Sequence, residues 1–204
     1  MNKLGQALAE IDRVRFLSPT FHSELVSEIR WSKEEALARR DGLDVASLEL
    51  SASDLAALQV VRSSDAMAVL RTLDKGHALG NSARKAFGLA AAALVLTIES
   101  SDDFVEGGRG LERLWLAATR RGIAVHPWGS PFVFQRLVEA PDTLDEWERG
   151  CLSRAMAAFD EAAPLGRSKS RILVLRLSRG AQATARSLRR PIAEVLTFDP
   201  AFDS

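Results

Sequence analysis

Two short, almost uninterrupted apolar runs limit what this chain can fold into more than any other feature of its sequence. LVLTI, residues 94–98, and RILVLRL, residues 171–177, have the length and the β-branched residues of core strands. A third apolar run, Ile123 to Val125, is shorter and leads into HPWGSPF. Helix patterns separate these runs without a regular βαβ alternation. The sequence therefore predicts an α+β fold, with a small mixed sheet surrounded by helices.

Amphipathic spacing predicts helices over much of the remaining chain. Residues 22–40 are expected to form one helix that stops before Asp41-Gly42, and residues 44–50 allow a short edge strand. Residues 54–73 predict either one helix or two helices separated at Ser63-Ser64. A later helix is expected to end at Gly122, and Asp142-Thr143 is expected to cap the helix that follows.

Length and composition favour one globular domain. The 204 residues fit a single domain over 1–204, with residues 1–20 as an N-terminal arm in one variant of this interpretation. The formal net charge of zero gives no reason to expect a nucleic-acid partner. Residues 88–98, the longest apolar stretch, span about half of the ~20 residues of a membrane helix, so no membrane partner is expected either. With Cys151 as the only cysteine, a reducing cytoplasmic location is expected.

Histidine and cysteine are sparse in this sequence. His22, His77 and His126 lie far apart in the sequence, and a single cysteine accompanies them, so no metal site is expected. The sequence contains no G-x-G-x-x-G after a strand, no P-loop and no G-x-S-x-G elbow. The common nucleotide-binding and serine-hydrolase signatures are therefore excluded.

A basic turn near the C-terminus is the strongest candidate anion site. Arg186, Arg189 and Arg190 place three guanidinium groups within five residues, directly before Pro191. Such a turn can clamp a phosphate through charge-assisted hydrogen bonds, or it can be a solvated basic surface. Gly107 to Gly110 likewise either present free amides to an anion at a helix start or form a flexible loop entry.

The order of these segments resembles a known family. GGRGLERLWLAATRRGIAVHPWGSP, a helix, RILVLRL and then ARSLRRPIAEVL resemble the C-terminal half of the nitroreductase-like flavoproteins. The similarity is to the branch in which a nitroreductase-like domain accompanies a ThiF-type adenylating domain. FHSELVSEIRW and DGLDVASLEL resemble the middle region of the same branch.

The resemblance implies a nitroreductase-like fold, FMN at a subunit interface, and hydride transfer from NAD(P)H through the flavin to an acceptor. By this similarity Pro127, Trp128 and Gly129 match the loop that lies against the flavin ring. Arg189 and Arg190, with Arg186 near them, match the basic positions at the FMN phosphate. The resemblance assigns no catalytic side chain, because the cofactor carries the redox chemistry.

Two N-terminal elements of the family are missing. The N-terminal part of the sequence has no Arg-Arg-Ser-x-Arg-like element and no Pro-Ser-x-x-Asn-x-Gln-Pro-Trp-like stretch, and Arg13 and Arg15 do not reproduce the spacing. One interpretation is an FMN-dependent oxidoreductase that works as a homodimer or with a partner chain that supplies the missing flavin ligands. The alternative is a cofactor-free, nitroreductase-like structural or accessory protein that pairs with another polypeptide.

Overall fold

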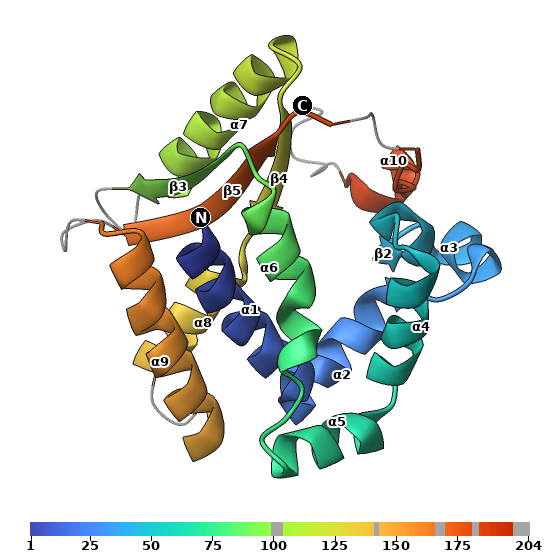
Figure 1. Cartoon of the computed structure of the whole chain (residues 1–204). Helices are drawn as coiled ribbons and strands as arrows, with labels where there is room; N and C mark the ends of the chain where they lie inside the picture. Colours follow the sequence, from blue (N-terminus) through green and yellow to red (C-terminus); the bar gives the residue numbers. More distant parts are fainter. Residues whose placement is uncertain (99–103, 141–142, 166–169, 181–183, 198–204) are drawn as a thin grey trace. The chain divides into compact units, whose positions relative to one another are not determined.

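The computed structural model describes residues 1–98, 104–140, 143–165, 170–180 and 184–197, drawn as ribbons in Figure 1. Contacts group the chain into two compact units. Unit 1 contains Met1–Pro19 and Met67–Ala181, and unit 2 contains Thr20–Ala66 and Gln182–Ser204. Most of the described residues are helical and the strands form two small sheets, which confirms the α+β class.

The three apolar runs form the sheet of unit 1. The strands β3 (Ala92–Ile98), β4 (Ala124–Trp128) and β5 (Ser170–Ser178) are antiparallel, in the order β3-β5-β4. Successive strand residues point to opposite faces, and both Val174 and Leu175 of β5 are fully buried. Both faces of the central strand are therefore covered. Figure 1 shows α7 (Phe104–Arg120) on one face and the other helices of unit 1 on the opposite face.

The helix α1 (Asn2–Leu17) forms the centre of the helical layer of unit 1. It packs against α6 (Asn81–Gly88), α8 (Ser130–Glu139) and α9 (Glu146–Ala162). Its side chains Leu8, Ile11, Val14 and Leu17 are almost completely buried. Within residues 1–20, for which an arm was one interpretation, α1 therefore lies in the core of this unit.

Arg13 is a buried charge on α1, and its side chain is only 4% exposed. Its Nε donates to the Lys75 carbonyl at 2.9 Å, and one terminal nitrogen donates to Asp74 at 2.6 Å. The other terminal nitrogen donates to Glu10 at 3.3 Å. The Cζ atom also lies 5.5 Å from the ring centre of Trp147 in the first turn of α9. One guanidinium thus joins α1 to α9 and to the turn that follows α5.

Unit 2 differs most from the sequence prediction. The single helix expected over residues 22–40 is wrong, because α2 (Pro19–Glu28) stops and α3 (Lys33–Arg39) starts anew. Between them lies β1 (Ile29–Arg30), which pairs in parallel with β2 (Leu43–Asp44). Ser32 caps α3 by accepting the Glu35 amide, and Arg30 donates to Asp41 at 2.9 Å. These interactions favour a break that the apolar spacing did not indicate.

Other helix boundaries follow the sequence more closely. Of the two alternatives for residues 54–73, the structure has two helices, with α4 (Ala52–Val61) ending before Ser63-Ser64 and α5 (Ser64–Thr72) beginning there. Gly122 follows α7 with φ of 64°, the left-handed conformation expected of a residue that ends a helix. The glycine run that begins at Gly107 lies within α7, which starts at Phe104. The flexible loop entry is therefore wrong.

Three remaining segments complete the comparison. The strand allowed over residues 44–50 is instead the end of β2 followed by the 3₁₀ helix η1 (Val45–Leu48). Asp142 lies outside the described residues, and the cap of α9 is Asp145, in a capping box with Glu148. Two further short helices are η2 (His77–Gly80) and α10 (Ile192–Val195). Within the ranges given above, no helix is both long and apolar enough to cross a membrane.

Gly80 allows η2 to approach α1 closely, and this contact gives a first prediction. A Cβ added at Gly80 would lie 2.7 Å from the Ala9 Cα, inside the closest approach of two carbons. Gly80→Ala should therefore lower the free energy of unfolding by about 2 kcal/mol or more, as overpacking does. Gly110→Ala is the matched control. Its Cβ meets nothing within 4 Å at an exposed position of α7, so the control should raise that free energy by up to about 1 kcal/mol. Urea denaturation of both variants measures the two effects.

Arg13 gives a second prediction about stability. Arg13→Ala removes three hydrogen bonds and the contact with Trp147, so the free energy of unfolding should fall by about 3 kcal/mol. Arg15→Ala, at an exposed position of the same helix, should change it by less than about 0.5 kcal/mol. Equal denaturation midpoints for the two variants would contradict the anchoring role of Arg13.

Candidate functional site

The segment expected to lie against a flavin ring is the junction of β4 and α8. Pro127 and Trp128 are the last residues of β4, opposite Leu175 and Val174, and Gly129 is the N-cap of α8. They therefore lie at a strand end and a helix start rather than in an open loop. Among the described strands β4 pairs only with β5, and an edge position tolerates a proline, which has no amide hydrogen to donate.

The indole of Trp128 points into unit 1. Its Nε1 donates to Asp12 Oδ1 on α1 at 3.3 Å. The ring meets Phe87 of α6 edge to face, with centroids 5.4 Å apart. His126, two residues earlier, lies 5.3 Å from the indole centroid. Trp128 is thus fixed from both α1 and α6, while Pro127 is exposed beside it.

Asp12 is the buried acid of this junction. Ser130, the first residue of α8, donates a hydrogen bond to the same Oδ1 atom at 3.1 Å. Burial raises the pKa of Asp12 to about 6, and the bonds from Ser130 and Trp128 and the charge of Arg15 offset this only in part. Asp12 therefore takes up and releases a proton close to neutral pH while it joins α1 to the β4–α8 junction.

A pair of polar side chains, His126 and Arg176, lies next to this junction. His126 is paired across the sheet with Arg176 of β5, whose Nε atom is buried and has no hydrogen-bond partner in the described part of the chain. Desolvation, followed by the charge of Arg176, lowers the pKa of His126. The imidazole is therefore mainly neutral at pH 7 and can accept a hydrogen bond.

The predicted arginine turn belongs to unit 2. Arg186, Arg189 and Arg190 are exposed in a segment without regular structure. Arg189 donates to the carbonyl groups of Ser187 and Leu188, at 3.3 and 2.9 Å. Arg190 Nε donates to a Glu194 carboxylate oxygen at 3.3 Å. The guanidinium groups are accessible to a ligand, and two of them already have acceptors within the chain.

The six predicted site residues fall into two groups. Pro127, Trp128 and Gly129 are together in unit 1, and the three arginines are together in unit 2. Sequence reasoning missed Asp12, although an acidic residue among the apolar positions of residues 4–17 was a visible signal. It also missed the role of Ser130, which was read only as part of a loop.

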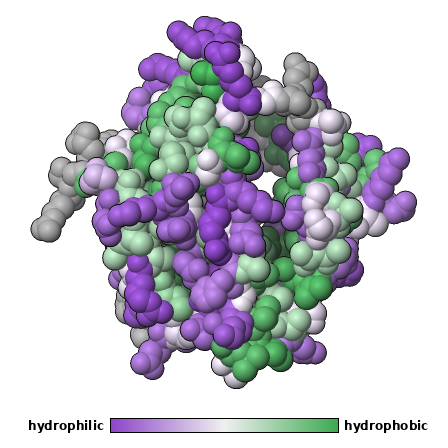
Figure 2. Space-filling model, in the orientation of Figure 1, coloured by the Kyte–Doolittle hydropathy of each residue, from purple (hydrophilic) through white to green (hydrophobic). Residues whose placement is uncertain are grey.

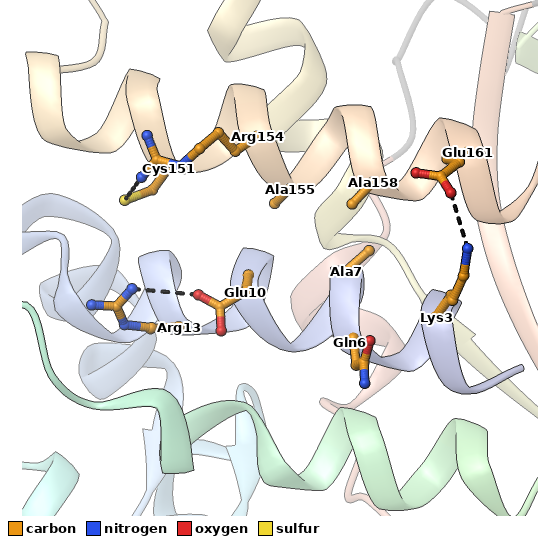
Figure 3. A pocket seen from close by; sticks show the side chains of 10 residues that line it. All are labelled: Lys3, Gln6, Ala7, Glu10, Arg13, Cys151, Arg154, Ala155, Ala158 and Glu161. Carbon is orange, nitrogen blue, oxygen red and sulfur yellow. Dashed lines mark hydrogen bonds and ion pairs between the residues drawn. The ribbon is translucent and has the colours of Figure 1, made fainter.

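A pocket of about 360 Å³ lies between α1 and α9 of unit 1, as Figure 3 shows. Alanines from both helices form its floor, and the Lys3–Glu161 ion pair, 3.0 Å long, spans one end. Glu10 and Arg13 lie at the other end. Hydrophilic side chains gather over these helices on the face seen in Figure 2. Because its rim is polar and its floor is small, this pocket is an open groove rather than a closed apolar cavity.

Cys151 is the one thiol that lines this pocket, and the amine of Lys3 is held in the ion pair with Glu161. Burial raises the pKa of the Cys151 thiol, and the nearby Arg154 and Arg13 lower it only in part, so the thiol stays protonated at neutral pH. Arg154 donates to the Sγ atom at 3.4 Å. No group of three or more His, Cys, Asp or Glu residues in the described ranges is arranged to hold a metal ion. The groove therefore carries no catalytic group that its contacts activate.

Comparison with known proteins gives one relevant relative. No family model matches the chain, and no solved structure matches it. The chain is 30% identical over 192 residues to "Uncharacterized protein MT1398" of Mycobacterium tuberculosis (strain CDC 1551 / Oshkosh). The match covers 93% of this chain and 27% of that protein. The chain thus spans about a quarter of the length of the relative that it matches.

The raised pKa of Asp12 gives a prediction about pH. The neutral form is favoured in the folded state, so the stability it contributes is complete below the unfolded pKa of 3.8 and is lost as pH rises through about 6. Asp12→Asn keeps an oxygen acceptor for Trp128 and Ser130 but cannot ionise. The variant should gain up to about 3 kcal/mol over the unchanged protein between pH 4 and pH 8, since two pKa units correspond to that free energy.

Denaturant titrations at several pH values measure this difference. Asp12→Ala is the control, because it removes the acceptor as well as the charge and should be less stable than Asp12→Asn throughout the range. A constant difference between Asp12→Asn and the unchanged protein across the range would contradict the role of ionisation.

Proposed function

We propose that this chain is a nitroreductase-type, FMN-dependent oxidoreductase module that passes electrons from NAD(P)H to an acceptor. The observation that carries the proposal is the geometry of the β4–α8 junction. The segment that matches the flavin loop lies at the edge of a sheet, directly before a helix, and its one bulky side chain points inward. The backbone edge at Pro127 to Gly129 thus has no partner strand among the described residues.

The residues at this junction fit a planar ring with polar atoms along its edge. Pro127 offers an exposed apolar surface, and the outer edge of β4 offers backbone groups to hydrogen-bond with such a ring. The bond from Trp128 to Asp12 holds the indole away from that edge. The bound flavin would supply the hydride chemistry. The chain positions the ring, and Asp12 and Ser130 keep the junction in one conformation.

The arginine turn of unit 2 is a separate candidate site, for the phosphate group. A phosphate group offers charged acceptors, whereas Arg189 now donates to backbone carbonyls and Arg190 to an exposed carboxylate. Charge-assisted bonds to a phosphate are stronger than bonds to neutral carbonyls, so the turn can exchange its present acceptors for a phosphate. Arg186 extends the positive surface of the same turn.

A second polypeptide completes the site in this proposal. The N-terminal flavin motifs of the resembled family are absent, so a second copy of the chain or a partner chain supplies those ligands. The match to a quarter of a longer protein supports a segment that works inside a larger assembly. NAD(P)H is then the proposed electron donor, and the junction with its neutral His126 remains the place where a ring would lie.

Two sets of contacts favour the alternative, a cofactor-free accessory protein that pairs with another polypeptide. Trp128 already has a hydrogen-bond partner and an aromatic neighbour, and the acceptors of Arg189 and Arg190 lie within the chain itself. A module with these contacts is stable without a ligand. The distinguishing observation is a stable, flavin-free complex with a second chain.

Flavin titration tests the first function. The purified chain should bind FMN with the absorbance of a flavoprotein, and Arg189→Ala combined with Arg190→Ala should weaken binding by about tenfold to a hundredfold, the loss expected for charge-assisted bonds. Riboflavin, which lacks the phosphate, should bind equally to both proteins. Arg179→Ala, an exposed arginine of unit 1, is the control and should leave FMN binding unchanged. A chain that stays colourless and binds no FMN at any concentration would favour the accessory function.

A further inference from the structure

Glu49 is a strained residue of unit 2 that the proposed function does not use. It follows η1 with φ of 49° and ψ of 40°, a left-handed conformation that costs a residue with a Cβ about 1 kcal/mol. Its side chain is exposed, so core packing does not explain the conformation. The contacts of its carboxylate do offer an explanation.

One oxygen of this carboxylate collects three donors from the C-terminal segment. The backbone amide of Thr184 donates to Oε1, the Thr184 hydroxyl donates to the same atom at 2.6 Å, and the Ala185 amide donates at 3.3 Å. These bonds lower the pKa of Glu49, so the carboxylate is ionised at neutral pH. The three donors thus surround one anionic oxygen.

These donors have the chemistry of an anion-binding site. Two successive amides and a hydroxyl that converge on one oxygen form the kind of backbone concavity that binds phosphate and other anions in proteins. Arg186, Arg189 and Arg190 follow directly and add positive charge. The carboxylate of Glu49 stands in for an oxygen of such an anion, and it comes from a part of the chain 135 residues away.

The internal occupant is well placed to be displaced. The Glu49 carboxylate and Thr184 are exposed to water, where ion contacts are screened and contribute little. Closing the contact also keeps Glu49 in its left-handed conformation. A phosphate group carries more charge and more acceptor oxygens than a carboxylate. It can also accept hydrogen bonds from the arginines that follow the loop.

We propose that Thr184 and Ala185 form a phosphate-binding loop which Glu49 closes from within the chain, so that a phosphate group and the Glu49 carboxylate compete for the same donors. The phosphate is either inorganic phosphate or the phosphate group of a larger ligand. The proposal rests on the proposed function only where that ligand is FMN. Glu49 then sets the affinity of the loop by occupying it when no phosphate is present.

Nuclear magnetic resonance of the full chain labelled with nitrogen-15 tests the competition. Addition of inorganic phosphate should shift the amide signals of Thr184 and Ala185 saturably in Glu49→Ala, with an affinity about tenfold or more above that of the unchanged protein. Glu49→Gln, which keeps an oxygen but loses the charge, should fall between the two. Glu34→Ala is the control, because Glu34 is an exposed carboxylate of α3 whose pKa is lowered by its own backbone and by Ser32. It should bind phosphate as the unchanged protein does.

A second variant checks the donors themselves. Thr184→Val in the Glu49→Ala background removes the hydroxyl and should reduce phosphate affinity severalfold. Unshifted Thr184 and Ala185 signals in a folded Glu49→Ala protein, as judged from its other amide signals, would overturn the proposal. Equal phosphate affinity in the unchanged protein and Glu49→Ala would overturn it as well.

The arms of the experiment separate this inference from the flavin function. FMN that shifts the two amides where riboflavin does not would identify the flavin phosphate as the ligand. Inorganic phosphate that shifts them while FMN does not bind would support the loop and contradict the flavin function. FMN bound with the same affinity with and without Glu49 would support the flavin function and contradict the competition.

Discussion

Two adjacent buried charges on α1 constrain unit 1 more than any other interaction. Asp12 and Arg13 are successive residues, and successive helical residues point about 100° apart around the axis. Asp12 therefore meets Trp128 and Ser130 at the β4–α8 junction, while Arg13 meets Asp74 and Lys75 before η2. Burying either charge without its partners would cost several kcal/mol, so α1 has one rotation that satisfies both. The position of the junction in unit 1 follows from this single helix orientation.

The sequence predicted those parts of the fold that depend on local pattern. Three apolar runs became the three strands of unit 1, and Gly122 ended α7, because strand periodicity and left-handed glycine act within a few residues. The helix expected over residues 22–40 failed because the partner of Arg30 is Asp41, eleven residues away. In α1 the polar pair interrupts an apolar stripe, and only tertiary partners show that it is buried.

The candidate site, like the fold, could be predicted from the sequence only where it depends on local composition. Unusual local composition identified Pro127 to Gly129 and the arginine turn, since prolines, glycine and clustered arginines stand out in any short window. The groups that control them come from far along the chain. Asp12 is 116 residues from Trp128, and Glu49 is 135 residues from Thr184, so no spacing rule relates either pair. The pairing of Asp12 with Trp128 and of Glu49 with Thr184 therefore emerges only from the folded structure.

Glu49 also links anion binding to the construction of unit 2. This unit consists of two segments distant in sequence, residues 20–66 and 182–204, and the Glu49 contacts join one to the other. The hydrogen bond from Arg30 is the main cause that lowers the pKa of Asp41, and the charge of Arg190 makes the smallest contribution. An anion that takes the donors of Thr184 and Ala185 breaks the link that Glu49 makes. Ligand binding at the turn and attachment of the C-terminal segment are then opposed. The affinity of the turn for an anion is therefore lowered by the free energy needed to loosen the contacts of this segment within unit 2.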